Sequence, residues 1–274
     1  MRSSIALLSD FGTQDIYVGV LKAVVARINP EAITIDLTHD IPPGDIRQAA
    51  FRLWQALPSM PRGCVLLAVV DPGVGTSRRP LAVQCEGFSC VGPDNGVFTY
   101  ILQGRRDARA VEISAAGKSN TFHGRDIFAP AAALLASGTE IERLGPFVSS
   151  PVTIPWPLLS CEKSGEILHG ETLFPDRFGN VVTSIGELTR DGENVLLDPW
   201  IPGGTGLKLP ASRLRIRCGR GLELSLSSTF SDVPKGFALA YIGSDKLLEI
   251  GVNRGSAVDS LGLASGMDVT LSWR

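Results

Sequence analysis

Carboxylate and imidazole side chains follow three apolar, strand-like segments in the first third of the chain. The segments and the polar residues that follow them are 5–8 with Asp10, 33–37 with His39 and Asp40, and 65–70 with Asp71. Glycine or proline stands close to each of these polar residues. Ligands of an α/β sheet bind outside the carboxyl ends of its strands, where such side chains can bind polar groups or transfer protons. The pattern predicts a ligand site at that edge of a buried sheet.

The segment 71–79 combines Asp71 with two glycines and two consecutive arginines, Arg78 and Arg79. It looks like a phosphate-binding loop, but the Lys-Ser/Thr pair of such a loop is missing, so we exclude binding of a nucleoside triphosphate. Taken by itself, the segment is at least as well explained as a turn that carries a solvated pair of arginines.

Three further features each have a structural and a functional interpretation. His123 stands just before a helix predicted over 126–136, where backbone N–H groups favour anions, although a lone histidine is more often structural. Asp126 is the expected N-cap of that helix. The segment 93–96 is a turn by its chemistry. Phe178 offers a stacking surface for a flat ligand, but burial in a core is the commoner fate of a phenylalanine.

Composition and missing motifs exclude several classes of function. The formal net charge of −2 provides no basic field for nucleic acid and no polybasic membrane anchor. The chain has no HxH, HxxxH or Cys/His cluster for a metal, no GxSxG elbow of a serine hydrolase and no GxGxxG of a dinucleotide enzyme. Five cysteines, an odd number, exclude a complete disulfide framework. The chain enters a strand almost at once and lacks an apolar run long enough for a bilayer, so we expect a cytoplasmic protein.

The rhythm of apolar residues divides the chain into two parts. Strands that alternate with helices predict an α/β domain over 1–150, with a mainly parallel sheet covered by helices. The predicted helices are 16–28, 45–57 with Asp45 as N-cap, and 126–136. A proline-rich stretch predicts a linker over 151–164. Short strands separated by Gly and Pro turns, with no convincing helix between them, predict a smaller all-β, barrel-like domain over 165–274.

Six segments together resemble the S-adenosyl-L-methionine (SAM) hydroxide adenosyltransferases, SAM hydrolases related to the fluorinase and chlorinase. The segments are 9–15, 36–43, 70–76, 92–96, 121–126 and 176–180. The resemblance implies attack of water or hydroxide on C5′ of SAM, in line with the sulfonium, to give adenosine and L-methionine. Because the leaving group is already cationic and departs neutral, the reaction needs neither a metal nor a general acid, and alignment of the reactants supplies much of the rate. No cofactor is expected, since SAM is the substrate.

The resemblance also assigns the residues of the site. The nucleophile is held by Asp71, Arg78 and His123, and Arg79 is the neighbour that is not used. The expected substrate-binding residues are Asp10 for the ribose hydroxyls, Asp15 and Asp176 for the methionine ammonium, Phe178 and Asn180 for the adenine, and Ser244 for the methionine carboxylate. The family implies a homotrimer in which each site lies between the N-terminal domain of one subunit and the C-terminal domain of the next.

Two positions depart from the family pattern. Ser184 stands where an Asn is usual, and Asp245 stands where the halogenases carry an Arg that binds the substrate carboxylate. Lys246 or backbone N–H groups are alternatives for that task. Two other functions remain open, a SAM-dependent halogenase and a SAM- or adenosine-binding sensor. The presence of both Asp71 and His123 favours water over halide, and a sensor would not need the complete catalytic set.

Overall fold

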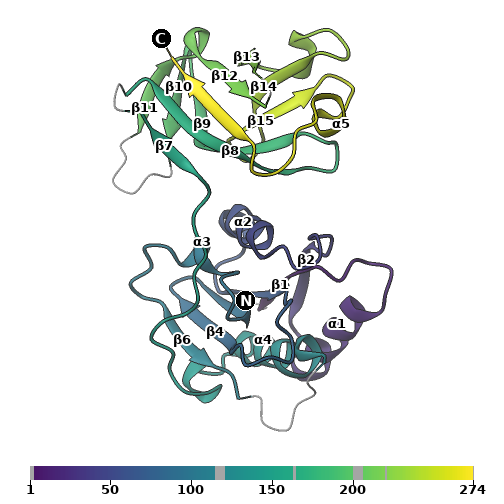
Figure 1. Cartoon of the computed structure of the whole chain (residues 1–274). Coiled ribbons are helices and arrows are strands. Elements are labelled where there is room, and N and C mark those ends of the chain that lie inside the picture. The colour runs from purple at the N-terminus through teal and green to yellow at the C-terminus, as the bar shows by residue number, and fades with distance from the viewer. Residues whose placement is uncertain (1–2, 115–120, 163–164, 200–205, 220, 274) are drawn as a thin grey trace. The chain divides into compact units, whose positions relative to one another are not determined.

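The computed structural model describes residues 3–114, 121–162, 165–199, 206–219 and 221–273. The chain forms two compact units, Met1–Pro155 and Trp156–Arg274, which are described separately (Figure 1). The division falls inside the segment 151–164 that the sequence predicts as a linker. Independent folding of the two parts stays a prediction.

The N-terminal unit contains a six-stranded sheet with the order β2-β1-β3-β5-β4-β6. Its strands are β1 (Ser4–Ser9), β2 (Ile33–Thr38), β3 (Cys64–Val69), β4 (Pro80–Cys85), β5 (Phe88–Pro93) and β6 (Arg109–Glu112). The first four strands in this order run parallel, but β4 is antiparallel to both of its neighbours. The sheet is therefore only partly parallel. The turn of two residues at Glu86 and Gly87 causes the difference, because parallel strands need a long crossover connection.

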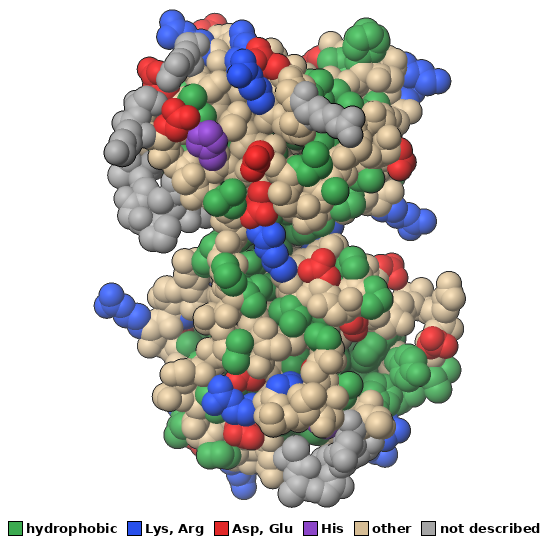
Figure 2. Space-filling view, in the orientation of Figure 1, with side chains coloured by type: hydrophobic (Ala, Val, Ile, Leu, Met, Phe, Trp, Pro, Cys, Tyr) green, Lys and Arg blue, Asp and Glu red, His purple; other side chains and the backbone are tan. Residues whose placement is uncertain are grey.

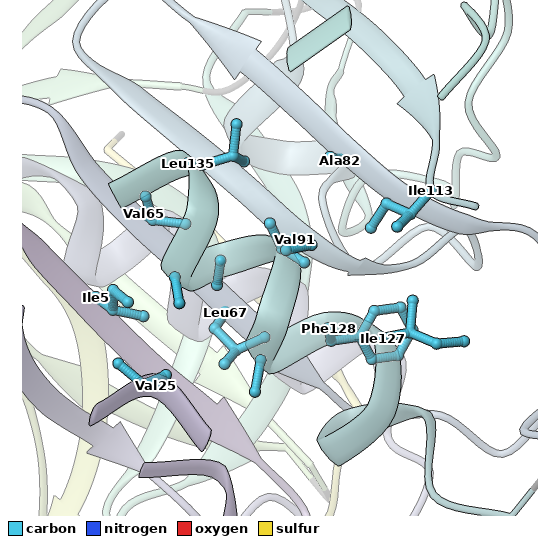
Figure 3. Packing of buried hydrophobic residues seen from close by; sticks show 14 of the residues in the cluster. Ile5, Val25, Val65, Leu67, Ala82, Val91, Ile113, Ile127, Phe128 and Leu135 are labelled. Atoms are coloured by element: carbon cyan, nitrogen blue, oxygen red, sulfur yellow. The ribbon is translucent and has the colours of Figure 1, made fainter. Parts of the chain in front are cut away.

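Successive residues of β1 and β3 belong to two different cores, because side chains alternate across a strand. Ile5 and Leu7 pack with α1 (Tyr17–Ile28) and α4 (Ala129–Ala136), as Figure 3 shows for part of this cluster. The intervening Ala6 packs with the helices of the other face, which are α2 (Ile46–Ala56), the 3₁₀ turn Leu57–Ser59 and α3 (Thr99–Leu102). A further 3₁₀ turn covers Ile141–Arg143. Helices on both faces leave the carboxyl edge of the parallel strands to carry polar residues.

The ends of two helices test the sequence interpretation. Asp45 caps α2, since its Oδ1 accepts a hydrogen bond from Gln48 N at 2.9 Å, as predicted. The predicted N-cap at Asp126 is wrong. A π-helical turn, Gly124–Phe128, precedes α4, and His123 stands at its N-cap position. Asp126 lies inside this turn and pairs with Arg125.

The C-terminal unit consists mostly of antiparallel strands around one core. The strands are β7 (Leu159–Cys161), β8 (Ile167–Pro175), β9 (Val181–Asp191), β10 (Asn194–Asp198), β11 (Leu207–Pro210), β12 (Arg215–Cys218), β13 (Leu222–Ser225), β14 (Ala238–Ile242), β15 (Leu247–Val252) and β16 (Asp268–Ser272). Pairing follows the order β11-β10-β9-β8-β16-β12-β13, while β15 joins β9 to β14 and β7 pairs with β8. A barrel-like closure stays a prediction.

A short helix interrupts the strands of this unit, contrary to the sequence prediction. The helix α5 (Ala257–Leu261) begins at Ser256, whose hydroxyl accepts from Asp259 N at 3.1 Å. It ends at Gly262, which adopts a φ of 64°. Five residues are too few to show a helical period in the sequence. The only local signals for this helix are its N-cap Ser256 and its C-cap Gly262. The 3₁₀ turns Ala211–Arg213 and Phe230–Asp232 complete the unit.

On the face that Figure 2 shows, basic and acidic side chains are interspersed rather than collected into one field. Within the described ranges, every helix is too short or too polar to cross a lipid bilayer.

Candidate active site

Asp71, Arg78 and His123 form a hydrogen-bonded cluster in the N-terminal unit. Asp71 and Arg78 belong to the loop between β3 and β4, and His123 begins the π-helical turn. Arg78 Nε donates to Asp71 Oδ1 at 2.9 Å, and Nη2 donates to Asp71 Oδ2. Nη2 also lies 2.7 Å from His123 Nδ1. Because a guanidinium group only donates, His123 Nδ1 is the acceptor, and in the neutral imidazole the proton lies on Nε2.

The cluster is withdrawn from solvent, which sets its protonation. The side chains of Arg78 and Asp71 are 10% and 6% exposed. The ring of Phe128 lies under the guanidinium, with 5.2 Å between its centroid and Arg78 Cζ. Burial and the positive charge of Arg78 lower the pKa of His123, and together they outweigh the opposite effect of the Asp71 and Asp126 carboxylates. His123 is therefore a neutral imidazole at pH 7.

Arg78 has one donor that the cluster does not use. Its Nη1 is buried and makes no hydrogen bond with the residues that the structure describes. A buried donor of this kind usually has a partner, because burial without one costs about 1–3 kcal/mol. The guanidinium therefore offers a place for an oxygen or a small anion beside His123 and Asp71.

Two consecutive turns bring Arg78 back to Asp71. Val74 N donates to Asp71 O at 3.2 Å, and Thr76 N donates to Gly73 O at 3.1 Å. Gly73 permits the close return, because a Cβ atom there would lie 3.3 Å from Arg78 Cγ. The interpretation of this loop as a turn with a solvated arginine pair is wrong for Arg78, whose guanidinium is almost entirely buried.

Arg79 is also bound, although it is not part of the cluster. Its Nε donates to Asp94 Oδ2 at 2.8 Å, and its Nη2 donates to Ser150 O at 3.0 Å. The other oxygen of Asp94 accepts from Val152 N at 2.7 Å. The predicted turn at 93–96 thus supplies a buried carboxylate that fastens the segment 150–152 to the N-terminal unit.

Asp10 and Asp15 lie at the same edge of the sheet as Asp71, after the end of β1. Asp10 Oδ2 accepts from Gly44 N at 2.9 Å, and Asp15 is exposed just before α1. Three aromatic rings connect this loop to the catalytic histidine candidate. The centroids of Phe11, Tyr17 and Phe122 are 5.4 to 6.0 Å apart, and Phe122 directly precedes His123.

The C-terminal unit places Asp176, Phe178 and Asn180 in one loop between β8 and β9. Asp176 Oδ1 accepts from the backbone N–H groups of Phe178 and Asn180 at 2.8 and 2.9 Å, and Oδ2 accepts from Asn180 Nδ2 at 2.9 Å. Phe178 is 77% exposed, so the alternative of a core position is wrong. Ser244 lies elsewhere in this unit, on the exposed turn between β14 and β15. The structure thus groups Asp176, Phe178 and Asn180 in one loop, whereas Ser244 belongs to another turn of the same unit.

An aromatic pair that the sequence did not predict lies beside Asn180. Phe230 and Tyr241 lie with their ring centroids 4.8 Å apart. A Cβ atom added to Gly251 would come within 2.7 Å of Asn180 Oδ1, 3.0 Å of Phe230 Cε1 and 3.1 Å of Tyr241 Cε1. The signal was a glycine inside a strand, which indicates a close approach to the backbone. Phe230 and Tyr241 thus lie close to the amide that the resemblance to the family assigns to adenine.

Ser184, which departs from the family pattern, has a structural role. Its hydroxyl is buried, donates to Leu158 O at 2.5 Å and accepts from Glu171 N at 2.8 Å. Across the described ranges, His, Cys, Asp and Glu side chains nowhere gather in threes as they would around a metal ion. The expectation that the protein uses no metal stays a prediction.

Comparison with known proteins identifies the family. Residues 5–145 match the SAM hydroxide adenosyltransferase N-terminal domain, and residues 170–270 match the C-terminal domain. A (R)-S-adenosyl-L-methionine hydrolase of Thermus thermophilus is 43% identical over 277 residues, which cover 96% of this chain and 97% of the relative.

Two more distant comparisons agree. A fluorinase of Actinopolyspora mzabensis is 27% identical over 302 residues, which cover 99% of this chain and 97% of that protein. The crystal structure of an uncharacterized conserved protein from Thermotoga maritima superimposes with a TM-score of 0.82 at 35% identity, covering 97% of this chain and 99% of the other. The match of both domains and the identity to the hydrolase show that the chain belongs to the SAM hydroxide adenosyltransferase family.

Proposed function

We propose that this enzyme hydrolyses SAM, with water or hydroxide attacking C5′ to give adenosine and L-methionine. The carrying observation is the Asp71–Arg78–His123 cluster with its unused donor at Arg78 Nη1. The 43% identity to a protein named (R)-S-adenosyl-L-methionine hydrolase supports the same reaction.

The cluster suits an oxygen nucleophile that carries negative charge. Arg78 Nη1–H and His123 Nε2–H are two donors that stabilise hydroxide more than water. Asp71 keeps the guanidinium in place through two hydrogen bonds. The proton that water loses passes to Asp71, which then gives up a hydrogen bond from Arg78.

The leaving group makes little demand on the protein. As the C5′–O bond forms, the C5′–S bond breaks, and its electron pair neutralises the sulfonium to a thioether. The departing sulfur therefore needs no general acid. The catalytic task that remains is to bind the nucleoside so that C5′ meets the activated oxygen in line, which is a matter of positioning.

The substrate-binding roles follow the family pattern. Asp10 binds the ribose hydroxyls, Asp15 and Asp176 face the ammonium, and Phe178 and Asn180 bind the adenine. Asp176 is already fully engaged in its own loop, so its role is to shape the loop as well as to supply charge. Ser244 is proposed for the methionine carboxylate. Further parts of the proposal are a cytoplasmic homotrimer without a cofactor, in which each site combines the two domains of neighbouring subunits.

The test is to incubate purified protein with SAM in ¹⁸O-labelled water and to analyse the products by mass spectrometry. We expect L-methionine and adenosine with one ¹⁸O at the 5′ position. Binding of SAM without release of adenosine would support the sensor instead. A 5′-halogenated nucleoside that forms only when halide is added would support the halogenase. An Arg78→Ala variant controls for contaminating hydrolases.

A further inference from the structure

Ser9, His39 and Asp36 form a hydrogen-bonded chain that the proposed reaction does not use. Ser9 Oγ lies 2.7 Å from His39 Nδ1, and His39 Nε2 lies 3.1 Å from Asp36 Oδ1. Lys22 Nζ donates to the other oxygen of Asp36 at 2.5 Å. The three residue types are those of a serine hydrolase triad, but Ser9 is only 1% exposed and so cannot attack a substrate. The chain must serve another purpose.

The direction of each hydrogen bond follows from Asp36. Burial raises the pKa of Asp36, but the hydrogen bonds from Lys22 and His39 outweigh it and hold that pKa below its ordinary value. An ionised carboxylate only accepts, so His39 Nε2 carries a proton. In the neutral imidazole Nδ1 is then the acceptor, and the Ser9 hydroxyl donates to it. Ser9 Oγ keeps its lone pairs for Phe11 N, which lies 3.4 Å away.

The same residues hold the backbone on both sides of Asp10. Gly12 N donates to His39 O at 2.8 Å, and Ile41 N donates to Ser9 O at 3.4 Å. Asp10 itself receives one hydrogen bond, from Gly44 N to Oδ2 at 2.9 Å. Among the described residues none donates to Oδ1, which is the oxygen left for a ligand. The loop after β1 is thus tied to the loop after β2, with Asp10 between the ties.

We propose that His39 is a positioning residue for substrate binding, which acts through Ser9 to hold the 9–12 loop so that Asp10 presents its carboxylate to the ribose hydroxyls. The inference rests on the proposed function, since it takes a nucleoside as the ligand of Asp10. His39 is 4% exposed, so its side chain offers almost no surface to a ligand.

The decisive measurement compares adenosine with 2′,3′-dideoxyadenosine, which lacks both hydroxyls that Asp10 would bind. Dissociation constants are measured by calorimetry for the wild type, His39→Gln, His39→Asn and Ser9→Ala. Glutamine can still donate to Asp36 but offers Ser9 no acceptor at the Nδ1 position, whereas the asparagine carbonyl does. We expect His39→Gln and Ser9→Ala to raise the dissociation constant of adenosine about tenfold, which corresponds to the loss of one well-placed hydrogen bond. The dissociation constant of dideoxyadenosine should stay unchanged.

His39→Asn should restore most of the preference for adenosine. In steady-state kinetics His39→Gln should raise KM for SAM and change kcat less than about twofold, since the nucleophile cluster is untouched. The matched control is His169→Gln, which removes the exposed pair of His169 Nε2 with Glu162 Oε1 at 2.9 Å. This substitution should change the affinity for neither nucleoside.

Several outcomes would overturn the inference. One is a His39→Gln variant that binds adenosine as tightly as the wild type does. Another is a variant that loses the same factor in affinity for adenosine and for dideoxyadenosine. If His39→Gln does not fold, Ser9→Ala is tested in its place, and it too must lose affinity for adenosine but not for dideoxyadenosine. A wild type that hydrolyses SAM but binds both nucleosides equally rejects the inference and leaves the proposed function standing. A wild type that releases no adenosine from SAM rejects the proposed function itself.

Discussion

Arg78 and Arg79 are consecutive residues whose guanidinium groups bind two different carboxylates. Arg78 binds Asp71 and contacts His123, whereas Arg79 binds Asp94. The two side chains reach different partners, so one short stretch of backbone serves two purposes. It completes the nucleophile cluster and, through Asp94, holds the segment that leads out of the N-terminal unit.

Replacing Arg78 by alanine should abolish chemistry far more than binding. Loss of a charged donor to a developing or bound hydroxide corresponds to about 2.7–4 kcal/mol, so we expect kcat to fall roughly 10²–10³-fold. The rate profile should also move to higher pH, because a less acidified water must supply the hydroxide. Asp10→Ala should show the opposite pattern, with weaker SAM binding. Single-turnover rates and SAM affinities of both variants across pH test this, and wild-type hydrolysis by Arg78→Ala would reduce Arg78 to a structural residue.

The pH profile should report the neutral state of His123. Burial and Arg78 lower its pKa below the ordinary value of 6.5, so activity should persist to pH values below 6.5 before His123 becomes protonated. The folded protein binds this proton less readily than the unfolded chain does, so the same shift should reduce stability as the pH falls below 6.5. An NMR titration of the His123 ring and kcat against pH measure both effects. If kcat already falls above pH 6.5 on the acid side, and this fall disappears with His123→Asn, the pKa of His123 is raised rather than lowered.

Asp94 should matter for stability more than an exposed ion pair does. Its side chain is 1% exposed, and Asp94→Ala would leave Val152 N without its acceptor and Arg79 without its carboxylate. We expect a loss of about 1–3 kcal/mol in the free energy of unfolding, with faster proteolysis within 146–155. Glu142→Ala is the control, because its pair with Arg109 is exposed on both sides and should contribute about 1 kcal/mol or less. If the two substitutions lower the free energy of unfolding equally, Asp94 does not hold the segment 150–152 in place.

Sites shared between subunits would be revealed by mixing two inactive variants. Arg78→Ala damages only the N-terminal half of a site and Asn180→Ala only the C-terminal half. If a trimer builds each site from two subunits, dissociating and reassembling the mixture should restore part of the activity, because some interfaces combine two intact halves. Light scattering of the wild type should give the mass of three chains. A monomer that hydrolyses SAM, or a mixture without recovery, would place each site within one chain.

The sequence predicted those features that depend on local chemistry or on spacing along the chain. Apolar runs that end in Asp10 and Asp71 located the polar edge of the sheet, and Asp45 was recognisable as an N-cap. The resemblance to the family singled out Arg78 rather than Arg79, and the geometry agrees, since only Arg78 contacts His123.

Features that depend on tertiary contacts could not be predicted from the sequence. Nothing local distinguishes the partner of Arg79, because Asp94 lies 15 residues away on another strand end. The aromatic pair Phe230 and Tyr241 meets Asn180 only after three strands have paired. Asp126 resembled an N-cap because the sequence does not reveal a π-helical turn.

That π-helical turn decides how the segment after His123 responds to a change in length. A π turn holds one residue more than an α turn, and here it stands between His123 and a regular helix whose position the core fixes. Deleting one residue within Gly124–Phe128 would let α4 continue regularly towards its start. His123 would then keep nearly the same side of the helix axis, because the α turn that replaces the π turn covers about the same rotation with one residue fewer. One residue deleted from the regular helix α4 would instead rotate everything before it by about 100°, and would separate the imidazole from the guanidinium without changing either side chain.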